Sequence, residues 1–415
     1  MASPLCDGVG MSVHEPPVRV AAAPRPATAP PLGPAAVLPD RAGPPPGPPG
    51  RPRPAGRRVV FVAWRDLASP EAGGSEILVD QLAAGISRRG DRAALLCGGP
   101  TGEHAYQVIR SGGSYSQFLR APGAYRRQLR ADCDLLVEVC NGMPFLAPLW
   151  TRTPVVCLVN HIHADLWPLR FRPPVSLAGR FAESTVMPWA HRRSLFLTVS
   201  SSTADALTRI GVSPARIRMI CNGVEPAPPP TARSPQPLFL ALGRLVGSKR
   251  LDVLLRLWDR VRPVTGGRLV IAGDGPERAR LEALAGPDVE FTGRVSEAEK
   301  HRLLCAAWLL LHPAMIEGWG IVVTEAAARG TPALGFRVPG LRDSVLDGRT
   351  GRLVSSETEF AAAWAALTVD HPAREALGRA ARHRAQELHW SAAVDGFSRV
   401  ADEAIALARG SARAC

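Results

Sequence analysis

The pattern of apolar residues along the chain predicts buried strands that alternate with amphipathic helices. Predominantly apolar runs of five or six residues recur, and the first of them, 59–64, is continuous, as in strands that are covered on both faces of a parallel sheet. In the first half they lie at 59–64, 93–97, 135–139, 155–159, 195–199 and 217–221. Between them, segments such as 77–86 carry apolar residues at three- and four-residue spacing, which is typical of helices. This alternation predicts a doubly wound α/β domain.

A second series of the same kind follows a segment rich in Pro, Ala and Ser between residues 222 and 237. Its strands are expected at 238–242, 269–272, 289–292, 309–312, 332–335 and 351–354. Its helices are expected to start near residues 250, 277, 296, 321 and 357, and a helical stretch from 373 to 409 breaks near residue 389. The sequence therefore predicts two Rossmann-like domains, 58–232 and 233–390, that face a cleft.

The N-terminal stretch differs from the rest of the chain in its amino-acid composition and in its apolar pattern. Residues 1–57 hold 16 of the 40 prolines and show no apolar periodicity. Such a segment buries too little apolar surface to offset the entropy lost on ordering, so we expect a disordered tail.

Composition narrows the class of protein. Hydrophobic residues make up 46% of the chain and charged residues 21%, as in ordinary globular proteins. No apolar run approaches the roughly 18 residues of a membrane-spanning helix, and no leader segment is visible. The eight cysteines form no Cys-x-x-Cys pair and fit no zinc pattern, which favours a reducing cytoplasm.

The net charge of +13 is weak evidence for a nucleic-acid partner. Of the 50 basic residues only Lys249 and Lys300 are lysines, so the excess reflects an arginine-rich composition. We expect no specific binding of nucleic acid. The two lysines are exceptions to this preference for arginine, so their positions are of interest.

The strongest candidate site is a pair of glutamates eight residues apart, Glu317 and Glu325, across a strand–loop–helix junction. Gly318 and Gly320 permit close backbone approach, and a helix that starts at Ile321 presents free N–H groups and its positive dipole end. A phosphate bound there would lie between two carboxylates that can accept hydrogen bonds from sugar hydroxyls. The alternative is a glycine-rich turn with solvated glutamates.

Two basic residues follow the first strand of the second domain. Arg244 lies two residues beyond the end of that strand, and Lys249 lies five residues further on. An arginine fork and a lysine point charge beyond a strand end can hold a diphosphate. Neither domain carries the Gly-x-Gly-x-x-Gly dinucleotide fingerprint after its first strand, which counts against an oxidoreductase.

In order and spacing, the motifs of residues 58–405 resemble those of the retaining GT-B glycosyltransferases of family 4. Besides the two-glutamate motif, the resemblance rests on Gly243-Arg244-Leu245 with Lys249, Gly273-Asp274-Gly275-Pro276, Val289-Glu290-Phe291-Thr292-Gly293 and Asp347-Gly348-Arg349-Thr350-Gly351. From the residues alone, the Gly273–Pro276 motif is first a strand-to-helix turn in which Pro276 starts the helix and Asp274 caps it, and second a lining of the donor site.

The resemblance implies a retaining transfer of a sugar from a nucleoside-diphosphate sugar to a hydroxyl of a glycan, a lipid-linked acceptor or a small molecule. It implies no metal and no cofactor, and a role in cell-envelope glycan synthesis. The alternative is a GT-B protein that binds nucleotide sugars or glycans with little or no catalysis.

The resemblance also assigns roles to residues. Arg244 and Lys249 would hold the donor diphosphate, and Glu325 would bind the ribose hydroxyls. Glu317 would contact the donor sugar beside Gly318. The amides near Gly320 and Ile321 would face phosphate.

Two further regions of the first domain match the family. Gly73 and Gly74 match its glycine loop, which approaches the β-phosphate; their plain alternative is a flexible turn. The family places a histidine after the strand at 155–159, where this chain has Asn160, His161 and His163. A register shift of one residue favours His161, with His163 second. We therefore expect Glu317, His161, Arg244 and Lys249 in the catalytic centre.

GT-B proteins typically send their last helix back to the first domain. Apolar residues from 394 to 407 recur at helical spacing, so we expect residues 391–415 to cross back. Residues 166–196 carry five arginines against one glutamate, with aromatics between them. Such a segment favours either a solvated packing face or peripheral contact with the inner face of the cell membrane.

Overall fold

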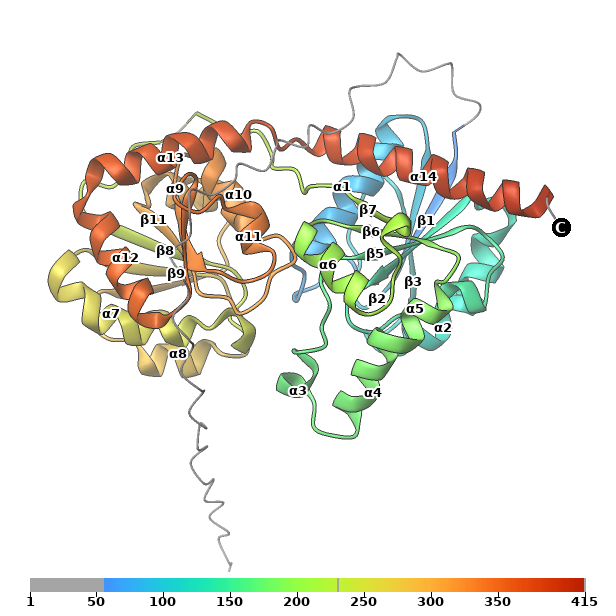
Figure 1. The fold of residues 1–415 in the computed structure, drawn as a ribbon, viewed down its shortest axis with the longest axis horizontal. Helices are drawn as coiled ribbons and strands as arrows, with labels where there is room; N and C mark the ends of the chain where they lie inside the picture. Colours follow the sequence, from blue (N-terminus) through green and yellow to red (C-terminus); the bar gives the residue numbers. More distant parts are fainter. Residues whose placement is uncertain (1–55, 230, 414–415) are drawn as a thin grey trace, which may run out of the picture. The chain divides into compact units, whose positions relative to one another are not determined.

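The computed structural model describes residues 56–229 and 231–413. Up to residue 55, the predicted Pro-rich tail lies outside the described residues. The described part of the chain contains two parallel β-sheets (Figure 1).

In the described residues, the first sheet has seven strands in the order β3-β2-β1-β4-β5-β6-β7. They are β1 (Arg58–Arg65), β2 (Arg92–Gly98), β3 (Gln107–Gly112), β4 (Leu135–Cys140), β5 (Val155–Val159), β6 (Leu195–Thr198) and β7 (Ile217–Met219). The helices of this half are α1 (Gly74–Arg88), α2 (Gln117–Gln128), α3 (Trp167–Arg170), α4 (Val175–Phe181), α5 (Met187–Ala190) and α6 (Ser201–Arg209).

The second sheet has six strands among the described residues, in the order β10-β9-β8-β11-β12-β13. They are β8 (Leu238–Leu242), β9 (Arg268–Ala272), β10 (Val289–Gly293), β11 (Leu309–His312), β12 (Ala333–Phe336) and β13 (Gly351–Val354). Its helices are α7 (Leu251–Thr265), α8 (Arg278–Leu284), α9 (Glu297–Ala306), α10 (Ile321–Ala328), α11 (Leu341–Ser344), α12 (Glu357–Val369) and α13 (His371–Ala385). The last helix of the chain is α14 (Trp390–Arg413).

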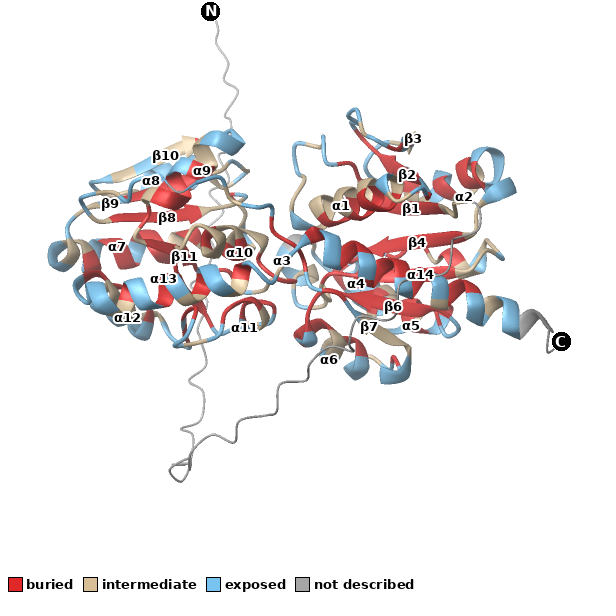
Figure 2. Cartoon of the chain, turned by 90° about the horizontal axis from the view of Figure 1, so that it is seen from above, coloured by how far each residue is buried: buried red, intermediate tan, exposed pale blue. Residues whose placement is uncertain are grey.

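Both sheets follow one rule of construction. The chain lays three strands in one direction and then returns to the far side of its first strand, so the order reverses beside β1 and beside β8. All pairings are parallel, and the central strands consist almost entirely of buried residues (Figure 2). In such sheets, ligands bind beyond the carboxyl ends of the strands, where the order reverses. The architecture confirms the predicted α/β class.

Two local predictions differ from the structure. The apolar pattern does not predict β3, because this edge strand buries only Ile109 among its six residues. The prediction that Pro276 starts a helix and Asp274 caps it is wrong. Helix α8 begins at Arg278 with Glu277 at its N-cap, and the Asp274 carboxylate instead accepts a 2.8 Å hydrogen bond from the Gly275 amide.

The C-terminal helix α14 crosses to the first sheet, as predicted. It packs on α1 and reaches β4, β5 and β6. Phe397 is fully buried and stacks on Phe61 of β1, with ring centroids 5.5 Å apart. A Cβ atom at Gly85 of α1 would lie 2.3 Å from Val394, so a glycine is needed there for the close approach of the two helices.

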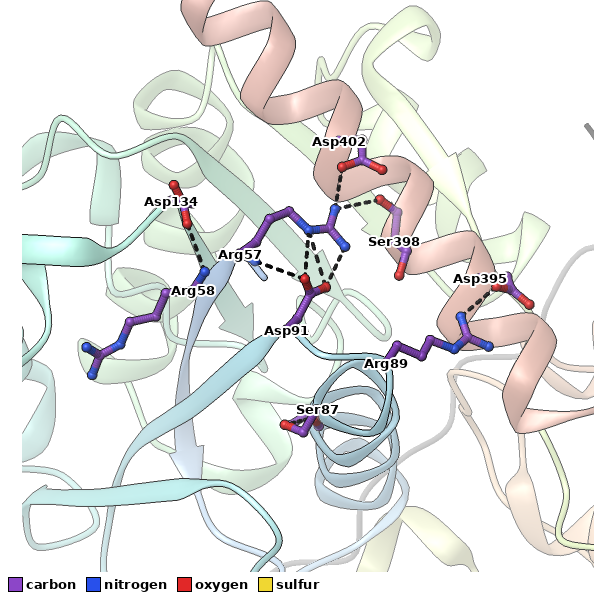
Figure 3. A network of polar contacts seen from close by, with 10 residues as sticks. Arg57, Arg58, Ser87, Arg89, Asp91, Asp134, Asp395, Ser398 and Asp402 are labelled. Atoms are coloured by element: carbon purple, nitrogen blue, oxygen red, sulfur yellow. Dashed lines mark hydrogen bonds and ion pairs between the residues drawn. The ribbon is translucent and has the colours of Figure 1, made fainter. Parts of the chain in front are cut away.

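Polar contacts along α14 reinforce this packing (Figure 3). The guanidinium of Arg57 lies 2.6 Å from the Asp91 carboxylate and donates to the Ser398 carbonyl at 3.1 Å. It also pairs with Asp402 on α14. Arg57 is the last residue of the predicted tail, so the folded part of the chain starts before that boundary.

The chain passes between the two sheets at two adjacent places. The first is the segment after β7, and the second is the segment between α13 and α14. The Val224 amide donates to the Leu388 carbonyl at 2.9 Å. A Cβ at Gly223 would lie 2.3 Å from the backbone nitrogen of Trp390. The two links therefore touch each other.

We expect Phe397→Ala to destabilise the protein by about 3–5 kcal/mol in urea unfolding, because it leaves a cavity between α14 and the first sheet. Asp395→Ala is the matched control on the same helix. Its carboxylate is 56% exposed and pairs with Arg89, so its loss should cost at most about 1 kcal/mol. Similar losses for the two variants would contradict the assigned role of α14.

Candidate active site

A cavity of about 540 Å³ lies beyond the carboxyl ends of the strands. Ligand sites commonly have volumes of about 300–1,000 Å³. The loops after β1, β4 and β5 form one wall, and the loops after β8, β9, β10 and β11 form the other. Every predicted site residue lines it: Gly73, Gly74, His161, Arg244, Lys249, Glu317, Gly318, Gly320, Ile321 and Glu325.

Glu317 is the centre of a compact charge cluster. Its carboxylate pairs with the Lys249 ammonium and lies 3.2 Å from Nε2 of His312 at the end of β11. Burial of Glu317 disfavours its charge, but Lys249 and His312 outweigh burial and hold its pKa well below the usual range. Glu317 is therefore an ionised carboxylate across the physiological pH range.

Glu325 takes part in a separate ion pair. Lys300 Nζ, from α9, lies 2.7 Å from the Glu325 carboxylate and 2.8 Å from that of Glu297. Burial alone would lower the pKa of Lys300, but the two carboxylates raise it above its ordinary value. Lys300 also lines the cavity. Both lysines of the chain thus pair with the two glutamates of the predicted motif.

Arg244 reaches the opposite wall of the cavity. Its guanidinium lies close to Gly73, where an added Cβ would meet it at 3.6–3.8 Å, and donates to the Glu71 carbonyl at 3.1 Å. The Glu71 carboxylate pairs with Arg65 at 2.8 Å. Arg294, after β10, makes a similar contact with the Pro70 carbonyl. Two arginines of the second domain therefore donate hydrogen bonds to the backbone of the loop after β1.

Two helix N-termini open on the cavity. Helix α1 starts behind Gly73, whose amide donates to Glu76 at 2.8 Å. Helix α10 starts behind Gly320, which has a φ of 86°, a conformation that favours glycine. The first amides of a helix lack partners within it, so Ile321 and its neighbours present donors to the cavity.

The backbone of Asn160 comes so close to residue 318 that only a glycine fits there. A Cβ at this position would lie 2.7 Å from the carbonyl oxygen of Asn160. Asn160 is buried, and its amide donates to Ser75 Oγ at 3.0 Å. Asn141 donates to the same hydroxyl at 2.6 Å. Asn160 thus lines the cavity and joins the loop after β5 to Ser75.

His161 and His163 both line the cavity, with their rings stacked 4.1 Å apart. The backbone amide of His163 donates to the buried Glu183 at 2.7 Å, and its ring lies 3.5 Å from that carboxylate. The pKa of His161 is held well below its ordinary value by burial, by His163 and by the positive charges of Lys249 and Arg244. His161 is therefore neutral at pH 7.

Sequence reasoning missed His312, Lys300, Ser75 and Asn141. The signal for His312 is a polar residue at the end of an otherwise apolar strand, and the signal for Lys300 is its rarity. Ser75 and Asn141 carry no comparable signal, since their meeting depends on the loops after β1 and β4.

Among the described residues, no group of three or more His, Cys, Asp or Glu side chains is arranged to hold a metal ion. None of the described helices has the length and apolar character needed to cross a bilayer.

Two family models match the chain in tandem. The model described as "Glycosyltransferase Family 4" matches residues 72–227, and the one described as "Glycosyl transferases group 1" matches residues 227–384. The two matches meet in the segment between β7 and β8.

Two curated relatives show how far the similarity extends. D-inositol 3-phosphate glycosyltransferase of Kribbella flavida is 32% identical over 249 residues, 52% of this chain and 57% of the relative. GDP-mannose-dependent alpha-(1-6)-phosphatidylinositol dimannoside mannosyltransferase of Mycobacterium tuberculosis is 28% identical over 371 residues, 81% of this chain and 93% of the relative. The match thus spans little more than half of the first relative and most of the second.

Among solved structures, sucrose-phosphate synthase from Thermosynechococcus elongatus superposes with a TM-score of 0.73. The likeness covers 84% of this chain and 99% of that chain at 20% sequence identity. At this identity the likeness is one of fold.

We expect Lys249→Met and Glu317→Gln to show a coupling free energy of about 1–2 kcal/mol in a double-mutant cycle of urea unfolding at pH 7. Each single variant leaves a partly buried charge without its partner. A carboxyl whose pKa is depressed in the folded state stabilises above its unfolded value, near 4.5, and loses that effect only as the pH falls through the folded value. The coupling should therefore persist at pH 5.

The control cycle uses Arg268→Gln and Glu290→Gln, an ion pair whose side chains are 54% and 51% exposed. Its coupling should stay below about 1 kcal/mol. A Lys249–Glu317 coupling that vanishes between pH 7 and pH 5 would contradict the depressed pKa of Glu317.

Proposed function

We propose that this chain, a member of the family 4 glycosyltransferases with the GT-B fold, transfers a sugar from a nucleoside-diphosphate sugar to an acceptor hydroxyl with retention of configuration. The observation that carries this proposal is that one cavity gathers every residue of the predicted site. Basic side chains, helix N-termini and sugar-binding carboxylates are the groups that such a donor requires.

The donor diphosphate would lie between Arg244, Lys249 and the N-terminus of α10, with the glycine loop at Gly73 and Gly74 on the other side. Lys249 has three N–H donors, so it can hold a phosphate oxygen while it keeps its contact with Glu317. The name of the M. tuberculosis relative, which specifies GDP-mannose, supports a nucleotide-sugar donor.

Glu325 would accept hydrogen bonds from the ribose hydroxyls. Its ion pair with Lys300 supports this role, because the ammonium fixes the direction of the carboxylate. Lys300 would then be a positioning residue that acts through Glu325.

Glu317 is a weak candidate for a covalent nucleophile. A carboxylate whose pKa lies well below its usual range is a poor base and a poor nucleophile. This favours a front-face transfer. The bond between the anomeric carbon and the β-phosphate oxygen breaks, the acceptor oxygen bonds on the same face, and its proton passes to the departing diphosphate.

In this route the protein would act through position and charge. Glu317, beside Gly318, would face the positive charge that develops on the sugar, and neutral His161 would contact it from the acceptor side. Arg244 and Lys249 would meet the charge of the leaving diphosphate, so the proposal requires neither a metal nor a cofactor. An NMR assignment of the product anomer tests retention.

The acceptor is proposed by class. The M. tuberculosis relative is named for a phosphatidylinositol dimannoside, which supports a glycan or lipid-linked acceptor of the cell envelope. A cytoplasmic location on the inner side of the membrane remains our expectation.

The experiment that tests the function is a thermal-shift screen of nucleoside diphosphates and nucleotide sugars, followed by assay of nucleoside-diphosphate release. A ligand of the native state raises its apparent stability, by about 2.7 kcal/mol at 100 times Kd. A donor that binds but is never turned over, with any acceptor tried, would instead support a non-catalytic binding protein.

We expect Arg244→Gln to lower turnover of the donor found in that screen by about 10²–10³-fold, because it removes a donor to the developing charge of the diphosphate. The fold should be intact, since this side chain lies at the cavity wall. Arg260→Gln, on the exposed face of α7, is the matched control and should keep wild-type turnover. Near wild-type turnover of Arg244→Gln at saturating donor would refute the diphosphate assignment.

We expect Lys300→Met to raise the donor KM by about tenfold while kcat changes less than about threefold, because only the orientation of Glu325 is lost. Glu297→Gln is the control, since this other partner of Lys300 is 86% exposed. Equal effects of the two variants, or an unchanged KM for Lys300→Met, would show that Lys300 does not position Glu325.

A further inference from the structure

The segment 166–193 of the first domain forms a surface with an unusual distribution of side chains. It contains α3, α4 and α5, with a short π-helical turn, Ala182–Val186, between the last two. Figure 1 shows α3 and α4 on the side of the first sheet away from α14. We call this segment the α3–α5 surface.

Helix α4 buries its small residues and exposes its large apolar ones, which is the reverse of an ordinary surface helix. Its buried residues are Ser176 and Gly179, and a Cβ at Gly179 would lie 2.3 Å from the ring of Trp167. Its small residues therefore face the protein and its large apolar ones face solvent. The exposed fractions on the α3–α5 surface are 63% for Leu169, 52% for Val175, 60% for Leu177, 60% for Phe181 and 56% for Trp189.

The charges on this surface have one sign. Arg172, Arg180, Arg192 and Arg193 are exposed, and none of them forms an ion pair within the described residues. The acidic residue of the segment, Glu183, is fully buried and bound to the amide of His163. Exposed apolar side chains thus lie in the same segment as arginines that form no ion pair with the described residues.

We infer that the α3–α5 surface docks on an anionic lipid bilayer. Apolar side chains of a helix that lies in the interface enter the boundary between headgroups and acyl chains, while arginines bind lipid phosphates. A second copy of the chain is a poorer occupant. A two-fold contact pairs the same patch with itself, which would bring the arginines of the two copies together.

The position of the surface relates it to the cavity. The chain enters it from His163, whose carbonyl accepts the amide of Leu166 at 2.7 Å. A bilayer held there would lie beside the acceptor side of the cavity. This link to a lipid-borne acceptor rests on the proposed function, whereas docking itself does not.

The test is co-sedimentation of the full chain, without donor, with vesicles of phosphatidylcholine alone or with about one third phosphatidylglycerol. We expect binding to the anionic vesicles that weakens as salt increases. The pairs Arg172→Gln/Arg180→Gln and Leu177→Ser/Phe181→Ser should each reduce affinity on the order of tenfold. All these side chains are exposed, so melting temperatures should be unchanged.

Two control variants test whether the loss of vesicle binding is specific to the α3–α5 surface. Arg209→Gln/Arg260→Gln removes the same charge from exposed positions elsewhere, and Leu119→Ser/Val369→Ser replaces apolar residues that are 87% and 74% exposed. Both should bind like wild type.

Four results would overturn the inference: no binding to anionic vesicles, equal binding to neutral ones, wild-type binding by both α3–α5 variants, or a concentration-dependent dimer that Leu177→Ser/Phe181→Ser abolishes. Because no donor is present, each is independent of whether the protein proves to be a transferase.

Discussion

The burial of one face of α14 against the first sheet is the interaction on which the rest of the structure depends. The helix belongs to the chain that leaves the second sheet, yet its apolar residues complete the core of the first. Trp319, from the loop that carries Glu317, is buried in that same core. The loop that presents Glu317 therefore packs partly on the other domain.

Charge compensation within the cavity follows from this arrangement. Lys249, from the loop after β8, meets Glu317 in the loop after β11, and Lys300, from α9, meets Glu325 on α10. Partly buried carboxylates would be costly without such partners. The site is thus electrically balanced before any ligand enters, and its cations are held in place by groups that sit beside them.

The sequence predicted most of the strands and the site residues, because buried parallel strands form continuous apolar runs and their carboxyl ends share one edge. It could not predict β3, whose edge position leaves its pattern polar. It marked Lys300 as unusual but could not pair it with Glu325, since 25 residues and a strand separate them. The contact of His312 with Glu317, and those of Ser75 with Asn141 and Asn160, depend on how neighbouring loops fold back. Local sequence periodicity does not predict such loop conformations. The start of the folded part was likewise hidden, because the contacts of Arg57 are made with residues far along the chain.

The two adjacent links at Val224 and Leu388 have a mechanical consequence. Two chains that pass side by side, joined by a hydrogen bond and packed at Gly223 against Trp390, resist twisting and sideways shear far better than one chain would. Any change in the relative position of the two cavity walls must therefore be accommodated at these two adjacent segments.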